Sequence, residues 1–256
     1  MPDNKNIGAP GADSSAEVLH QIGGKTLLDR ARDLFGDDPR FWGRYFKTPS
    51  DFGGVQYNPN HEHAVLAQRK IRVAPIARQT GNVHGTQADG ARDARGNVDA
   101  IFAAFGADYL RSQGGQFFVY LDVEGDPNPS LSASYWIGWA LTLQAYSRQS
   151  SQDGVTLLPG LYCNLDHATW IALAQAQQTA PCSSVWLARW VADPPTCVVP
   201  PPWNPAHVQP SPAPNCPVHA WQYAAECGGG DGIDTNEANP GLDLDAFLGK
   251  LILPPA

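Results

Sequence analysis

The chain has 256 residues, of which 43% are hydrophobic and 16% are charged, and its formal net charge is −8. This length suits a single large domain, and the negative charge without a basic stripe argues against a nucleic-acid partner. No apolar run approaches the roughly 18 residues of a membrane span, so we expect no span.

The first sixteen residues are polar and contain neither the basic start nor the apolar core of a secretory signal. We interpret residues 1–16 as a flexible N-terminal tail.

Strand-like and helical patterns then alternate along the chain. In order, they predict a strand at 17–24, a helix at 26–36, a strand at 40–46, a helix at 61–70, a strand at 71–77 and a helix at 87–105.

The next strand, at 116–122, is a hydrophobic run that ends in two carboxylates. Asp122 and Glu124 stand at positions i and i+2, where the chain stops being apolar. Two such residues of a strand point to the same face and lie about 6.6 Å apart along the chain. We therefore expect both side chains on one wall of a site. The alternative is a pair of solvated acids before a surface turn.

The second half of the chain continues the alternation. The patterns predict a helix at 132–146, a strand at 155–163, a helix at 166–176, strands at 184–190 and 218–224, and a short strand running into a closing helix at 241–252. The proline-rich residues 192–217 predict one long irregular insertion. Eight strands with helices between most of them favour an α/β fold, a (β/α)8 TIM-type barrel or a modified form of it. We expect a single domain over residues 17–256, with a doubly wound sheet as the alternative.

Paired acids at a strand end suit the cleavage of a glycosidic bond. In a barrel, active sites lie at the carboxyl ends of the strands. Two close carboxylates perturb each other, so one keeps a proton near neutral pH and serves as general acid. The other stabilises or traps the oxocarbenium-like centre. Asp122 and Glu124 are the candidates for these two roles.

Aromatic residues gather near the ends of other predicted strands. Their rings offer flat apolar faces that suit sugars, although each ring alone also fits a core position. The candidates for substrate binding are Tyr45, Tyr162, Trp190, Trp221 and Tyr223.

Cysteine and histidine spacing does not predict a metal site. The five cysteines contain no CxxC pair, and His61 and His63 have no third ligand near them in the sequence. We expect neither a metal nor a cofactor. Cys197 and Cys216 bracket a proline-rich stretch and are candidates for a disulfide if the protein works outside the cytosol.

Five motifs occur in a recognisable order: YLDVEGDP, LLPGLYCN, SVWLARW, HAWQYA and GLDLDAF. The series resembles the strands of glycoside hydrolase family 25, the bacterial and phage muramidases, and of related glycoside-hydrolase-like barrels, over about residues 40–250. The resemblance implies a modified α/β barrel that acts on peptidoglycan. It also implies that Glu124 is the proton donor, that Asp122 is its carboxylate neighbour, and that Asp243 is the acid of the closing strand.

One position departs from the family pattern. Family members carry an acid on the first strand in a G-x-D pattern, whereas the segment expected to match, IGGKT, has Lys25 there. A lysine tunes the pKa of nearby acids but cannot supply an anion. The departure favours an alternative in which the barrel binds glycan without cleaving it.

The leading hypothesis is a lysozyme-like peptidoglycan hydrolase that cleaves the β-1,4 glycan backbone through Glu124. We expect a monomer without a membrane span that acts on the cell wall after signal-independent export, as a delivered antibacterial effector or as a lysin. An immunity protein would then be a second partner. Besides the non-catalytic glycan-binding barrel, a cytosolic barrel enzyme with another substrate fits the missing signal but not the motifs.

Overall fold

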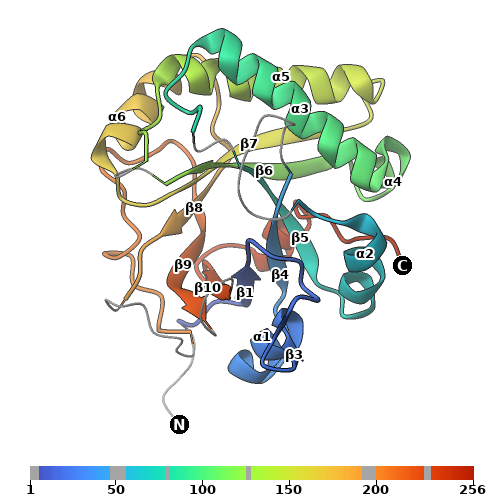
Figure 1. Ribbon diagram of the computed structural model, residues 1–256. Coiled ribbons are helices and arrows are strands. Elements are labelled where there is room, and N and C mark those ends of the chain that lie inside the picture. The colour runs from blue at the N-terminus through green and yellow to red at the C-terminus, as the bar shows by residue number, and fades with distance from the viewer. Residues whose placement is uncertain (1–5, 47–55, 79–80, 125–127, 192–199, 228–231) are drawn as a thin grey trace.

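The computed structural model describes residues 6–46, 56–78, 81–124, 128–191, 200–227 and 232–256. Eight strands close into one barrel in the order β1-β10-β9-β8-β7-β6-β5-β4 (Figure 1). They are β1 (Pro10–Asp13), β4 (Phe41–Tyr45), β5 (Arg72–Arg78), β6 (Gln116–Val123), β7 (Thr156–Cys163), β8 (Ser184–Ala188), β9 (Val218–Cys227) and β10 (Ile233–Ala238). The predicted α/β barrel in a single domain is confirmed.

Helices cover the outside of the barrel. They are α1 (Leu27–Phe35), α2 (Pro59–Gln68), α3 (Gln87–Phe105), α4 (Ala107–Ser112), α5 (Ala133–Ser150), α6 (His167–Ala176) and α7 (Leu244–Leu248). Figure 1 shows α3 and α5 side by side over β6 and β7. Side-chain N-caps at Thr26, Thr86 and Ser132 begin three of the predicted helices within a residue or two of their expected starts. None of the helices in the described ranges is long and apolar enough to cross a membrane.

The first barrel strand lies in the segment that was expected to be a tail. β1 pairs parallel with β4 and antiparallel with β10, and Ala12 and Asp13 are buried. The boundary expected at residue 16 therefore falls after the first strand of the barrel. Residues 17–24, expected to be that strand, contribute instead to a separate hairpin of β2 (Gln21–Ile22) and β3 (Lys25–Thr26).

The last barrel strand is β10, not a strand within residues 241–252. β10 runs antiparallel to both of its neighbours, which is the modification of the regular barrel. Residues 244–248 form the short helix α7, whose Phe247 packs edge-on against Phe41 and stacks against His219. Because Phe41 and His219 stand near the start of β4 and β9, α7 closes the amino-terminal end of the barrel.

Large side chains fill the barrel interior above α7. Trp186 meets the rings of Phe41, Tyr120 and Tyr162 edge-on and is fully buried. A second apolar layer lies between the sheet and its helices. Among the described residues the barrel is therefore filled through its middle, and the carboxyl ends of the parallel strands are the end expected to hold a ligand site.

The described part of the proline-rich insertion, residues 200–217, contains no helix or strand. Its Trp203 packs against Trp221 on the outside of β9. Cys216 is a free thiol, in contrast to the expected disulfide with Cys197, which itself lies outside the described residues. Cys227 is the described cysteine that takes part in a disulfide.

Candidate active site

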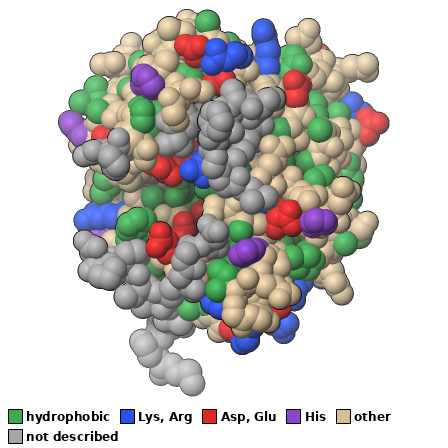
Figure 2. All heavy atoms as spheres, in the orientation of Figure 1, with side chains coloured by type: hydrophobic (Ala, Val, Ile, Leu, Met, Phe, Trp, Pro, Cys, Tyr) green, Lys and Arg blue, Asp and Glu red, His purple; other side chains and the backbone are tan. Residues whose placement is uncertain are grey.

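Polar side chains from seven strands meet at the open end of the barrel. Strand pairing sets Arg78 beside Asp122, Asp122 beside Tyr162, and Asp13 beside Asp234. This is the end where barrel active sites are built. Figure 2 shows Asp and Glu side chains near the middle of the molecule's face as well as at its rim.

Two aspartates from neighbouring antiparallel strands form what we call the acid pair, Asp13 at the end of β1 and Asp234 at the start of β10. Asp13 is 3% exposed, whereas Asp234 is partly exposed. Because β10 is antiparallel, its first residues reach the open end of the barrel. The reversal of this one strand therefore brings the second acid to the first.

Two amides hydrogen-bond to the acid pair. Gln222 Nε2 lies 3.3 and 3.4 Å from the two carboxylate oxygens of Asp13 and 3.2 Å from Asp234 Oδ2. Asn236 Nδ2 donates to Asp13 Oδ1 at 2.6 Å. The backbone N–H of Glu226 donates to Asp234 Oδ1 at 2.7 Å. These donors favour the charged forms of both acids.

Burial works in the opposite direction and dominates. It raises the pKa of Asp13 well above its usual value, and the charge of Asp234 raises it further, against the hydrogen bonds from Asn236 and Gln222. Burial also raises the pKa of Asp234 to about 6, with help from the charges of Glu226 and Glu124. A pair of this kind shares a proton near neutral pH and presents less than two full charges to a ligand.

The structure places both predicted acids of β6 at the same site. Asp122 is buried in the barrel wall, and its charge acts on Asp13. Glu124 follows the strand, accepts a hydrogen bond from Asn128 Nδ2 at 2.8 Å, and lines a cavity of about 300 Å³ together with Asp234. Asn164 donates to the backbone carbonyl of Glu124 and so fixes this segment.

Three of the five predicted aromatic residues border the site. Tyr162 and Trp190 line the same cavity as Glu124. Tyr45 is close enough to the acids that their charges raise the pKa of its phenol, after burial, and the guanidinium of Arg78 lies 5.0 Å from its ring centroid. Trp190 is 51% exposed, so its ring is open to a ligand.

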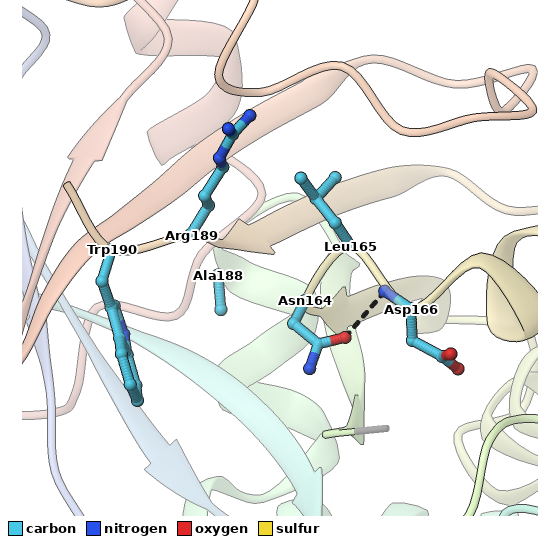
Figure 3. Close-up of a pocket in the computed structure, with 6 residues that line it drawn as sticks. All are labelled: Asn164, Leu165, Asp166, Ala188, Arg189 and Trp190. Carbon is cyan, nitrogen blue, oxygen red and sulfur yellow. Dashed lines mark hydrogen bonds between the residues drawn. The ribbon is translucent and has the colours of Figure 1, made fainter. Parts of the chain in front are cut away.

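A second hollow, of about 420 Å³, continues from this cavity and shares Asn164, Ala188 and Trp190 with it. Figure 3 shows Arg189 and Trp190 on opposite sides of the segment after β8, with Asn164 and Leu165 across from them. The two hollows together form a groove that suits an extended ligand better than a small one.

The remaining predicted site residues lie elsewhere. Asp243 follows the antiparallel β10, so it lies at the closed end of the barrel, where its Oδ1 accepts from Ala246 N at 3.0 Å and caps α7. Trp221 and Tyr223 are fully buried, and Trp221 packs against Trp203 and His207. Neither ring can offer a face to a sugar. The acid that the closing strand brings to the site is Asp234.

Comparisons with solved structures agree on one fold. An uncharacterised protein from B. stearothermophilus has 23% identity and a TM-score of 0.66 over 95% of this chain and 100% of its own. The spore cortex lytic enzyme SleM of Clostridium perfringens has 14% identity and a TM-score of 0.58 over 96% of this chain and 70% of its own. A family 25 lysozyme from Aspergillus fumigatus has 13% identity and a TM-score of 0.53 over 95% of this chain and 99% of its own.

The chain has the family 25 fold. No family model and no curated protein matches the sequence. The evidence for the likeness is therefore the three-dimensional arrangement, and at these identities it establishes the fold alone.

The position of β1 changes which residue is assigned as the acid of the first strand. Lys25 lies in the β2–β3 hairpin outside the barrel and pairs with Asp33 at 2.6 Å. The G-x-D pattern occurs instead at Gly11-Ala12-Asp13, on β1. The apparent loss of an acid came from assigning the first strand to residues 17–24. The G-x-D pattern occurs six times in the chain, so it needed the position of β1 in the barrel to single out Asp13.

Proposed function

We propose that the protein is a peptidoglycan hydrolase of the muramidase type, which cleaves the β-1,4 glycan backbone with Glu124 as general acid. The observation that supports this most is a cluster of four acids at the open end of the barrel. Glu124 and Asp234 line the cavity, and the buried Asp13 and Asp122 lie close enough for the charges of Asp122 and Asp234 to act on Asp13. The family 25 fold is consistent with that chemistry. The acids come from three different strands, as expected of a site built at a barrel's open end.

Glu124 is placed to deliver a proton to the leaving oxygen. It is partly exposed and lines the cavity, and its carboxylate accepts a hydrogen bond from the amide of Asn128. An amide N–H that donates to one carboxyl oxygen leaves the other free to carry the proton.

Asp122 and the acid pair supply negative charge at the floor of the site, although the shared proton leaves the pair with less than two full charges. An oxocarbenium-like centre is stabilised by anions that are already in place and shielded from water. Asp122 and Asp13 are buried, and Asp234 forms part of the cavity wall. Asp122 alternatively holds the N-acetyl group of the substrate so that its carbonyl oxygen attacks the anomeric carbon.

The test is the release of reducing ends from purified bacterial cell walls. We expect activity from the wild type and a loss of at least about 100-fold in kcat for Glu124→Gln, because the amide cannot donate an acidic proton. Asp243→Asn is the matched control. It removes a carboxylate from the closed end of the barrel and leaves activity within about twofold.

Two results would contradict the proposal: a wild type without turnover, or a Glu124→Gln variant as active as the wild type. Glycan binding without turnover would support the non-catalytic barrel. That alternative rested on Lys25, which lies outside the barrel. Export, delivery as an antibacterial effector and an immunity partner stay predictions.

A further inference from the structure

Both polar atoms of the Gln222 side chain are engaged in hydrogen bonds. Its Nε2 faces Asp13 and Asp234, and its Oε1 accepts from the indole Nε1 of Trp190 at 3.1 Å. The residue is 1% exposed, on β9 between the groove and the floor of the site. It therefore connects an exposed ring at the mouth of the groove with two buried acids.

The indole decides which way round the amide lies. An indole N–H is only ever a donor, so the atom that faces it must be the amide oxygen. The opposite orientation would set the amide NH2 against the indole N–H and the amide oxygen against two carboxylates. The contact between the two N–H groups would be repulsive in every protonation state of the acids, so a single orientation is retained.

A second indole holds a second amide in the same manner. Trp186 Nε1 donates to Asn236 Oδ1 at 2.8 Å, and this orients the Asn236 amide so that it donates to Asp13. Trp186 is fully buried in the barrel interior, whereas Trp190 is 51% exposed and lines both parts of the groove. A ligand can therefore contact only one of the two indoles.

We propose that Gln222 is a positioning residue whose amide Trp190 holds in one orientation, so that its NH2 group stays directed at the acid pair. Substrate stacked on Trp190 steadies that indole and with it the amide. The groove and the charge of the acid pair are thereby coupled through one hydrogen-bonded chain. The catalytic consequence rests on the proposed function, whereas the effect on the acids does not.

The titration of the acid pair depends on all the groups that face it. These are Tyr45 from β4, Arg78 from β5, Asp122 and Glu124 from β6 and its end, Tyr162 from β7, Gln222 and Glu226 from β9, and Asn236 from β10. The phenols and Asn236 keep their protonation state near neutral pH. Removing the Gln222 donors withdraws support from the charged forms, so both acids should titrate at higher pH.

The experiment follows the carboxyl ¹³C shifts of aspartate-labelled protein from about pH 3 to about pH 8. Asp13→Asn and Asp234→Asn assign the two signals. We expect the midpoints of the acid pair to move upward in Gln222→Met, and to move upward by a smaller amount in Trp190→Phe, which keeps an apolar ring but loses the N–H. Trp221→Phe is the matched control, because its indole N–H donates to the backbone carbonyl of Arg189 at 2.7 Å.

The pH profile of cell-wall hydrolysis gives the second measurement. If the pKa that governs the acidic limb of the profile rises by one unit, kcat falls roughly tenfold at pH values below it. We expect a change of that order in Gln222→Met. Trp190→Ala should raise KM and also shift the acidic limb of the pH profile upward. Trp190→Phe should mainly shift that limb. Trp190→Phe alters a half-exposed ring, so it remains informative if Gln222→Met does not fold.

Unchanged carboxyl midpoints in Trp190→Phe, or an equal shift in Trp221→Phe, would overturn the inference. If the wild type releases no reducing ends, the proposed function fails while the carboxyl titration still decides the role of Gln222. If the wild type is active and the midpoints do not move, the inference fails alone.

Discussion

At the scale of single residues, the acids of the site oppose folding. Burial raises the pKa of Asp234 to about 6, from an ordinary value of 3.8. The folded state therefore binds more protons than the unfolded state between those two values. By linkage, the contribution of this carboxyl to stability falls as pH rises from about 4 to about 6, and it stays unfavourable above that range.

Asp234→Asn should therefore stabilise the protein at pH 7 by roughly 1–2 kcal/mol, after allowance for the partial exposure of the residue. The gain should shrink as the pH falls and disappear at about pH 3, where the wild-type carboxyl is largely protonated in both states. Urea unfolding at the two pH values measures this. An Asn variant that is less stable than wild type at pH 7 would show that the carboxylate hydrogen bonds outweigh its burial.

Half of the acids at the site could be predicted from the sequence. Asp122 and Glu124 end a hydrophobic strand, and that contrast makes them visible. Asp13 stands in PGAD and Asp234 in IDTNEA, two strands without an apolar run. No local pattern predicts them as strands, because their pairing comes from closure of the barrel rather than from propensity.

At the scale of elements, the helices with side-chain caps were predicted close to their observed bounds. The two strands that close the barrel, β1 and β10, were not predicted. β1 has no β-branched or aromatic residue, and Gly11 is required because a Cβ atom there would lie 2.2 Å from the ring of Phe41. Asp243 was assigned to a closing strand, although its side chain caps α7. An acid before an apolar run can be either an active-site acid at a strand end or the N-cap of a helix. The structure was needed to decide between these two roles.

Deletion of residues 1–16 tests the assignment of β1. The deletion removes a strand that pairs on both edges and leaves β4 and β10 unpaired on one side. We expect the shortened chain to be unfolded or aggregated, because open strand edges associate. Circular dichroism and size-exclusion chromatography would check this. A folded monomer with a wild-type melting temperature would mean that these residues are a dispensable tail.

The helix α7 offers a second prediction at this scale. Phe247 is 3% exposed and packs against Phe41, Phe118 and His219 at the closed end of the barrel. Phe247→Ala should cost about 3–5 kcal/mol in the free energy of unfolding, because it leaves a cavity in a packed layer. The pH profile of activity should keep its midpoints, since this end holds none of the four acids of the proposed active site. A shifted profile would show that the two ends are coupled.

At the scale of the whole molecule, net charge should affect how the protein approaches the proposed substrate, peptidoglycan. The formal charge is −8, and stem peptides of peptidoglycan also carry carboxylates. Long-range repulsion between them is screened as the Debye length falls to about 8 Å at physiological ionic strength. We therefore expect kcat/KM on cell walls to rise a few-fold between about 10 mM and about 150 mM salt. A decline over this range would indicate attraction through a local basic surface instead.

The closed barrel explains how the separate features become one site. β10 is reversed, so the chain ends bring Asp13 and Asp234 together, while β6 contributes Asp122 and Glu124 across the cavity. The alternation of strands and helices predicted the barrel. It could not predict the reversal of the last strand, which depends on a pairing between residues more than 200 positions apart.

The central claim is that this cavity cleaves the glycan backbone at the muramic acid position. Mass spectrometry of borohydride-reduced digests tests it most directly, because reduction marks the sugar that carries each new reducing end. We predict products ending in reduced N-acetylmuramic acid with the wild type and none with Glu124→Gln. Products ending in reduced N-acetylglucosamine, or equal products from both proteins, would contradict the account.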